Sequence, residues 1–256
     1  MIEVCQLCAG YADRTVLKQL SFTIEPGEWV TIVGRNGSGK STLLRSMARL
    51  LPPLQGDIRL QGKPLVDYGR KELARTVSVL PQSRDVPSIS VEGLVSHGRF
   101  PYLGLSRRLT EEDEQKIEYA LCCTGAQAYR HRLLQELSGG ERQKAYLAMT
   151  IAQDAPVLFL DEPTTYLDIA TQFELLALID RLHKKGKTIV MVLHDLQQAL
   201  AVSQRMLLLE QGRLVQFAPP EEMIRSGALQ ECFSIRIESV RSKSGCTHYC
   251  FEPKDR

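Results

Sequence analysis

The chain has 256 residues, of which 43% are hydrophobic and 24% charged, a composition typical of a folded globular protein rather than a disordered one. Its 32 Lys and Arg against 30 Asp and Glu give a formal net charge of +2, too small to indicate a nucleic-acid-binding protein. The longest apolar runs, such as Val157–Leu160 and Ile189–Leu193, are far too short to cross a membrane. The pattern argues against an integral membrane protein, but not against one that docks on a membrane protein.

The seven cysteines follow no regular spacing, and the first residues lack the charged and apolar regions of an export signal. We therefore expect the protein to work in a reducing cytoplasm. Cys5 and Cys8 have a C-x-x-C spacing, but they fall in a predicted first strand and have no second ligand pair. We expect neither a redox nor a zinc site there.

The first strong signal is a buried strand, Trp29–Val33, that runs into a glycine-rich turn and then a helix predicted over 41–51. Pro52 and Pro53 stop this helix. Strand, glycine loop and helix in this order open a parallel α/β unit. Short apolar runs that recur later in the chain are of the kind buried on both faces of such a sheet.

The turn itself, Gly34-Arg35-Asn36-Gly37-Ser38-Gly39-Lys40-Ser41, fits the pattern G-x-x-x-x-G-K-[ST] of a phosphate-binding loop. Glycines let backbone N–H groups wrap an anion, and the helix N-terminus adds a partial positive charge. Lys40 would reach the β- and γ-phosphates of a nucleotide, and the Ser41 hydroxyl would bind Mg²⁺. The alternative is a glycine-rich turn before an ordinary helix. The residues assigned to nucleotide binding here are Gly34, Asn36, Gly37, Ser38, Gly39, Lys40, Ser41 and Thr42.

Residues from about 86 to 150 are mostly helical in pattern and predict a helical subdomain inserted into the sheet domain. Thr110, followed by three acidic residues, marks a helix start. Leu137-Ser138-Gly139-Gly140-Glu141 precedes a helix predicted from about Arg142 to Gln153. A Ser hydroxyl and Gly amides at a helix start can bind an anion, or Ser138 can simply cap the helix. Two phosphate-binding loops in one chain indicate that two copies share two nucleotides.

Asp161 and Glu162 follow the predicted strand Val157–Leu160 at its carboxyl end, which is the edge at which parallel sheets bind ligands. Asp161 would hold Mg²⁺ through its water shell, and Glu162 would polarise an attacking water. Alone, both acids could equally be solvated or cap the next helix.

Asp168 is predicted to cap the following helix, which ends near Gly186. Met206–Phe217 has the pattern of a hairpin, and a short helix follows Pro219. The tail, residues 227–256, predicts a terminal hairpin with strands Ser234–Val240 and Cys246–Phe251. Cys246, His248 and Cys250 alternate along the second of these strands, but their i, i+2, i+4 spacing is too wide to hold one ion, and their role stays open.

From about Ile2 to Ser226, the order and spacing of these motifs resemble the ATPase subunit of an ABC transporter. The resemblance implies a phosphate-loop (RecA-like) α/β core with the inserted helical subdomain at 86–150 and an N-terminal antiparallel β region, together forming one domain over 1–226. It also implies roles for single residues. Tyr11 would stack on adenine, Gln82 would reach the metal and the attacking water, and His194 would contact the γ-phosphate. Asp168 would belong to a loop that crosses to the partner copy.

The resemblance implies an enzyme that hydrolyses ATP with Mg²⁺ and works as a homodimer. It also implies that the dimer docks on membrane permease subunits at the cytoplasmic face of the bacterial inner membrane, with a substrate-binding protein as an indirect partner. Val95–Leu103, with Gly98-Arg99-Phe100-Pro101-Tyr102, is similar to importer ATPases for iron–siderophores, haem and vitamin B12. It places Arg99 and Tyr102 on the surface that receives the permease. An iron–siderophore is the first expectation for the cargo, then vitamin B12, then haem. The competing hypotheses are a soluble ABC-type ATPase of DNA repair or translation, and a regulatory module that binds nucleotide without hydrolysing it.

Overall fold

The computed structural model describes residues 1–12, 14–80, 82, 86–104, 108–165, 167–241 and 247–254. The chain forms two compact units. The first unit consists of Met1–Val66 and Val190–Arg256, and the second of Asp67–Ile189. The predicted helical subdomain, residues 86–150, therefore lies wholly inside the second unit.

An antiparallel sheet at the start of the first unit confirms the predicted N-terminal β region. Its strand order is β2-β1-β4-β5. Alternate apolar residues of β1, among them Ile2 and Val4, are buried, as expected for a sheet with one covered face. The strands are β1 (Ile2–Tyr11), β2 (Arg14–Ile24), β4 (Gln55–Leu60) and β5 (Lys63–Pro64).

The first unit also holds strands in the order β10-β9-β3-β8. β3 (Trp29–Val33) is buried throughout and pairs in parallel with β9 (Arg205–Glu210). β9 pairs antiparallel with β10 (Arg213–Ala218), which is the predicted hairpin. The boundary between the units falls inside β8 (Thr188–Val192). Helices α1 (Lys40–Met47) and α7 (Leu196–Val202) belong to this unit.

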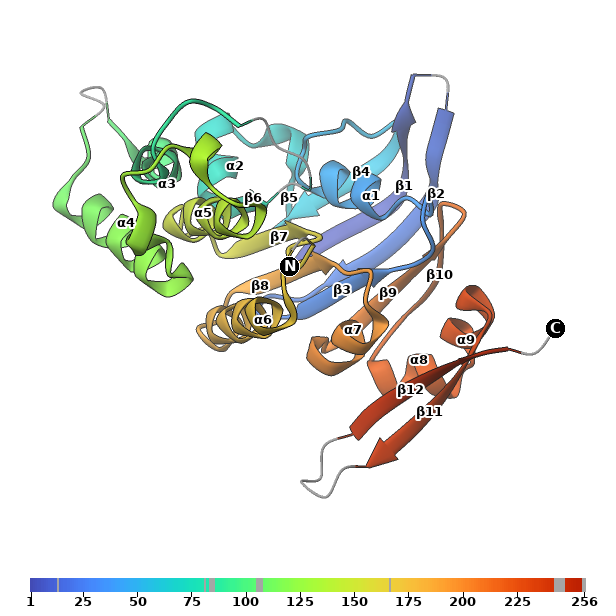
Figure 1. Cartoon of the computed structure of the whole chain (residues 1–256). Helices are drawn as coiled ribbons and strands as arrows, with labels where there is room; N and C mark the ends of the chain where they lie inside the picture. Colours follow the sequence, from blue (N-terminus) through green and yellow to red (C-terminus); the bar gives the residue numbers. More distant parts are fainter. Residues whose placement is uncertain are drawn as a thin grey trace. The chain divides into compact units, whose positions relative to one another are not determined.

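The tail of the first unit forms two short helices and a hairpin (Figure 1). α8 (Pro220–Arg225) and α9 (Ala228–Phe233) precede β11 (Ile235–Arg241), which pairs antiparallel with β12 (Thr247–Pro253). Gln197 of α7 donates a side-chain hydrogen bond to the carbonyl of Tyr249 in β12 over 3.0 Å. Cys246 lies outside the described residues, so the predicted row of three soft ligands is not described as a whole.

The second unit combines parallel strands with a cluster of helices (Figure 1). Its strands follow the order β8-β7-β6, and β6 (Val77–Leu80) pairs in parallel with β7 (Val157–Asp161). Every residue of β7 is buried, as in a strand covered on both faces. The helices are α2 (Arg70–Thr76), α3 (Val91–His97), α4 (Glu111–Thr124), α5 (Gly139–Ala152) and α6 (Ile169–Lys184).

Two helix ends differ from the sequence prediction. α5 begins at Gly139 rather than Arg142, because the Ser138 side chain accepts a hydrogen bond from the Glu141 amide and caps the helix before its two glycines. α1 ends at Met47 rather than Leu51, because Arg49 adopts a left-handed conformation with φ 57°. The Leu50 amide then bonds back to the Arg45 carbonyl over 2.8 Å, which closes the helix end.

Among the described residues, every helix is too short or too polar to cross a lipid bilayer. In that same part of the chain, no three His, Cys, Asp or Glu side chains gather as they would around a metal ion.

Candidate active site

The phosphate loop has the sharp backbone that its glycines allow. Gly34 follows β3 with φ 150°, and Gly39 caps α1 with φ 103°. A Cβ atom on Gly34 would lie 2.2 Å from the Leu209 carbonyl oxygen, and one on Gly39 would lie 2.7 Å from Leu17. Only glycine fits both positions, so the loop stays tight enough for its backbone N–H groups to face one point.

Two side chains of this loop fit an anion with several oxygen atoms. Lys40 is 6% exposed, and its Nζ donates to the carbonyls of Gly34 over 2.9 Å and Arg35 over 3.2 Å. The ammonium thus lies folded over the loop. The Ser38 Oγ is buried and has no hydrogen-bond partner within the described residues. Because a buried hydroxyl without a partner is costly, it indicates a ligand that supplies one.

The loop allows a matched test with alanine. Gly34→Ala should abolish nucleotide binding, because the new Cβ collides with backbone that cannot move aside. Gly37 also has positive φ, at 77°, but a Cβ there meets nothing within 4 Å. Gly37→Ala should therefore bind nucleotide far better than Gly34→Ala, with a backbone cost of about 1 kcal/mol. Equilibrium binding of a fluorescent ATP analogue measures both, and equal binding by the two variants would contradict this account.

Two further residues assigned to the nucleotide also lie in the first unit. Tyr11 ends β1 and is 44% exposed, and the Arg45 guanidinium lies 5.9 Å from the centre of its ring. An exposed ring has a face on which a base can stack. His194 is exposed in the loop between β8 and α7.

In the second unit, the structure brings Gln82 and Glu162 into contact. Glu162 follows β7 directly, is 8% exposed, and adopts a left-handed backbone with φ 51°. Gln82 Nε2 donates to Glu162 Oε2 over 2.7 Å, and the Thr165 hydroxyl donates to the same oxygen over 3.3 Å. Asp161, at the end of β7, is 4% exposed. Strained backbone and a nearly buried carboxylate are features that cluster at functional sites.

Sequence reasoning missed the residues that fix the loop after Glu162. Gln143 of α5 donates to the Pro163 carbonyl over 2.8 Å. Gln172 of α6 donates to the carbonyls of Thr164 over 3.2 Å and Leu167 over 3.1 Å. Both glutamines point inward from helices that the sequence does predict, but their targets are main-chain atoms with no signal in the sequence. They hold the backbone that presents Glu162.

The residues of the second predicted anion site line a hollow of about 490 Å³ in the second unit, and Asp168 is also part of its lining. The Ser138 amide donates to Glu141 Oε2 over 2.8 Å, and the Glu141 amide donates to Ser138 Oγ over 3.3 Å. Hydrogen bonds from the Ser138 amide and side chain to the Glu141 carboxylate lower the pKa of Glu141. Asp168 caps α6, and bonds from the Thr171 amide and hydroxyl lower its pKa in the same way. The sequence predicted the Asp168 cap, and it offered a cap at Ser138 only as the alternative to an anion site.

The same hollow contains Tyr129 and Lys144, which sequence reasoning did not identify. Burial raises the pKa of Tyr129 to about 12, so its hydroxyl stays protonated at neutral pH. Lys144 lies one turn after Glu141 on α5, so helical spacing could have found it. A lysine, a hydroxyl and a helix start together suit an anion such as phosphate.

The prediction that Arg99 lies on the docking surface is wrong. Arg99 is 4% exposed, and its Nε donates to Asp113 Oδ1 over 2.8 Å. Its Nη1 donates to the Ala152 carbonyl over 2.9 Å, and its guanidinium lies 3.9 Å from the centre of the Tyr102 ring. Arg99 therefore joins α4 and α5 from inside, while the neighbouring Phe100 is 52% exposed.

Comparison with known proteins identifies the family. The family model described as "ABC transporter" matches residues 17–165, more than half of the chain. The petrobactin import ATP-binding protein FpuC of Bacillus anthracis is 43% identical, over 93% of this chain and 88% of the relative. The iron(3+)-hydroxamate import ATP-binding protein FhuC of Bacillus subtilis is 41% identical, over 92% and 88%. A solved inward-facing metal-chelate-type ABC transporter has a TM-score of 0.84 at 27% identity, covering 99% of this chain and 98% of that one. The chain belongs to the ABC transporter family and is one of its ATPases.

Proposed function

We propose that this chain is the ATPase subunit of an importer that takes up an iron–siderophore complex. The phosphate loop carries the proposal, because Lys40 and the buried Ser38 hydroxyl, which has no hydrogen-bond partner among the described residues, suit a bound polyphosphate. The cargo class rests on the relatives, whose names specify the import of petrobactin and of iron(3+)-hydroxamate.

In the proposed mechanism, the phosphate loop, residues 34–42, holds the phosphates of ATP, and Tyr11 stacks on the adenine. Ser41, Gln82 and Asp161 would hold Mg²⁺, which when bound neutralises charge on the phosphates. The assigned phosphate-loop contacts are those at Gly34, Asn36, Gly37, Ser38, Gly39, Lys40, Ser41 and Thr42.

Glu162 would act as the general base that polarises the attacking water, and His194 would contact the γ-phosphate. Gln82 and Thr165 both donate to Glu162 Oε2. If Gln82 held a bound metal instead, it would no longer donate to this oxygen, which could then accept a proton from water more readily. A change in one glutamine side chain would then couple nucleotide binding to the readiness of the base.

A second copy of the chain would complete each site with Ser138, Gly139, Gly140, Glu141 and Asp168. ATP would favour the closed dimer because only there do both sets of contacts form, and hydrolysis would release it. The dimer would bind permease subunits at the cytoplasmic face of the bacterial inner membrane. A substrate-binding protein outside would deliver the cargo. We propose residues 1–226 as the ATPase domain and 227–256 as its C-terminal tail.

Uptake by cells tests this function directly. Bacteria that lack the gene should fail to take up radioactive iron bound to petrobactin or to a hydroxamate siderophore, and the parental gene should restore uptake. Lys40→Ala should not restore it, because the phosphates lose their lysine. Uptake of haem and of vitamin B12, measured in parallel, should be unchanged. Normal siderophore uptake without the gene would refute the proposed cargo, and loss of vitamin B12 or haem uptake alone would reassign it.

A further inference from the structure

The second unit contains a cavity that none of the roles above uses. Its volume is about 460 Å³, within the range of small-molecule sites. It lies beside the amino end of β7, where Ala155 and Leu158 contribute to its wall, whereas Asp161 ends the same strand. At about 3.3 Å per residue, the two ends of β7 are roughly 13 Å apart. The lining of the cavity includes no residue assigned above to the nucleotide or the metal.

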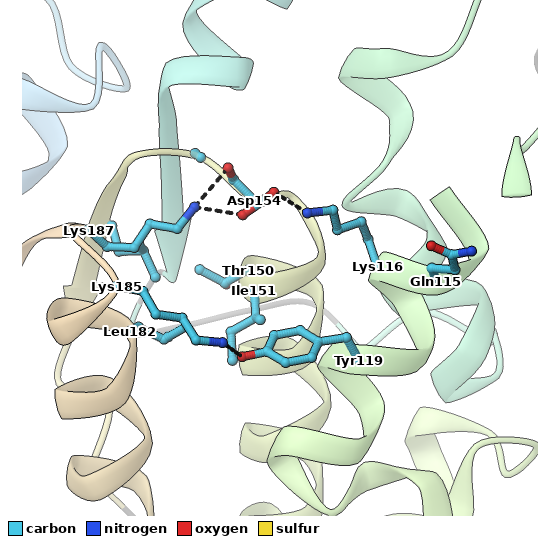
Figure 2. A pocket seen from close by; sticks show the side chains of 11 residues that line it. Gln115, Lys116, Tyr119, Thr150, Ile151, Asp154, Leu182, Lys185 and Lys187 are labelled. Carbon is cyan, nitrogen blue, oxygen red and sulfur yellow. Dashed lines mark hydrogen bonds and ion pairs between the residues drawn. The ribbon is translucent and has the colours of Figure 1, made fainter. Parts of the chain in front are cut away.

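Three lysines from two segments, α4 and the connection between α6 and β8, converge on this cavity (Figure 2). Lys116 of α4 and Lys187, just before β8, approach Asp154 from two sides, with Nζ–Oδ distances of 2.8 and 2.6 Å. Lys185, just after α6, donates to the Tyr119 hydroxyl over 2.8 Å and lies 4.7 Å from the centre of its ring. The lining thus has three lysines and one acidic residue, so its charged side chains sum to about +2 at neutral pH.

Asp154 and Lys185 both stay charged at neutral pH. Burial by itself would raise the pKa of Asp154, but the hydrogen bonds from Lys116 and Lys187 outweigh it and keep the pKa below its ordinary value. The hydrogen bond to Tyr119 raises the pKa of Lys185. Each ammonium has three donors. Lys116 and Lys185 each use one in the bonds given above, and Lys187 uses two, one to Asp154 Oδ1 and one to the Asp154 carbonyl over 3.0 Å. Donors therefore remain for an anion with several acceptor oxygens.

The rest of the lining is apolar. Ile151, Ala155, Leu158 and Leu182 are buried core residues whose side chains close the cavity, and the Tyr119 ring forms part of its rim. A ligand that fits must combine a compact dianion with an apolar or aromatic body. Inorganic phosphate would satisfy the lysines only.

We propose that this lysine cavity binds a small organic phosphate monoester. The group carries a charge of about −1.5 to −2 at pH 7 and three acceptor oxygens, which matches both the excess charge and the spare donors. Its organic part would lie on the apolar wall. The ligand would connect α4 with the connection between α6 and β8, which are joined here by the bond from Lys185 to Tyr119 and through Asp154, which pairs with both Lys116 and Lys187.

Calorimetry on the full chain with phenyl phosphate as the probe tests the proposal. Lys116→Gln and Lys185→Gln should each weaken binding about tenfold or more, because each removes a charge-assisted hydrogen bond. Both variants should fold, since Asp154 keeps Lys187 and glutamine can still bond the Tyr119 hydroxyl. Lys184→Gln is the matched control, because its side chain is 72% exposed, pairs with Asp180 and lies outside the cavity. This control should bind like the parent.

Every measurement is repeated in the Lys40→Ala background, because the phosphate loop can also bind phosphate. Binding that survives Lys40→Ala and falls with Lys116→Gln and Lys185→Gln supports the cavity. Binding that disappears with Lys40→Ala, equal binding of phenyl phosphate and inorganic phosphate, or no measurable binding would each overturn the proposal. None of these outcomes depends on transport, so failure here leaves the proposed cargo untouched.

Discussion

Glu162→Gln should lower the rate of ATP hydrolysis by at least about a hundredfold, the usual contribution of a positioned general base, while ATP binding persists. Glutamine has nearly the same shape as glutamate but cannot accept the proton of the attacking water. The backbone at this position has φ 51° and its loop is held by Gln143 and Gln172, so the substitution leaves the local structure in place. With turnover blocked, ATP should hold the dimer closed.

Two measurements check this result. Phosphate release gives the rate, and size-exclusion chromatography with and without ATP gives the fraction of dimer. Glu221→Gln serves as the control, because Glu221 is an exposed residue of α8 and should leave both quantities unchanged. A Glu162→Gln variant that hydrolyses ATP at the parental rate would show that another group acts as the base. A monomer that binds ATP without ever dimerising would refute the shared site.

The parts of this site that the sequence could predict are those that depend on a motif of a few consecutive residues. The phosphate loop, the Ser138 cap and the Asp168 cap each depend on side chains within about three residues of the backbone they serve. Even there, the sequence predicts the start of α5 at Arg142, because Gly139 and Gly140 have a low helix propensity. The Ser138 cap outweighs that propensity, so the helix begins at Gly139.

The contacts that a sequence cannot reveal by itself join distant residues. Gln82 and Glu162 lie 80 positions apart, and only the family resemblance placed both at one site. The lysine cavity needs α4, α6 and the start of β8 to converge, and no spacing along the chain encodes that. Arg99 was expected on the surface, where an arginine normally lies unless it is paired. Its buried partner, Asp113, is 14 residues away along the chain, so the sequence does not reveal the pair.

Arg99→Ala should cost on the order of 3–5 kcal/mol of the free energy of unfolding, since it leaves Asp113 buried without its charged partner. It also removes the hydrogen bond to the Ala152 carbonyl and the packing against the Tyr102 ring. Arg75→Ala is the matched control. Arg75 is exposed, lies 5.2 Å from the same ring and donates to the Pro101 carbonyl over 3.0 Å. Its loss should cost about 1 kcal/mol or less.

Urea unfolding compares the two variants, and siderophore uptake at a temperature where both remain folded separates stability from docking. If Arg99→Ala unfolds at the parental urea concentration but abolishes uptake, the arginine serves the permease rather than the core. If unfolding shifts strongly and uptake by the folded variant is normal, the buried ion pair is structural, as its burial and three contacts indicate.

The pH dependence of unfolding adds a readout specific to the ion pair. Burial alone would raise the pKa of Asp113, but the hydrogen bonds from Thr110 and Arg99 outweigh it and hold the pKa below its ordinary value of 3.8. A carboxyl whose pKa is depressed by folding stabilises the protein above that ordinary value and loses the contribution as the pH falls through the folded-state pKa. The difference in stability between the parent and Arg99→Ala should therefore be full at pH 6 and shrink below about pH 4. A difference that stays constant down to pH 3 would assign the effect of Arg99 to packing against Tyr102 rather than to its charge.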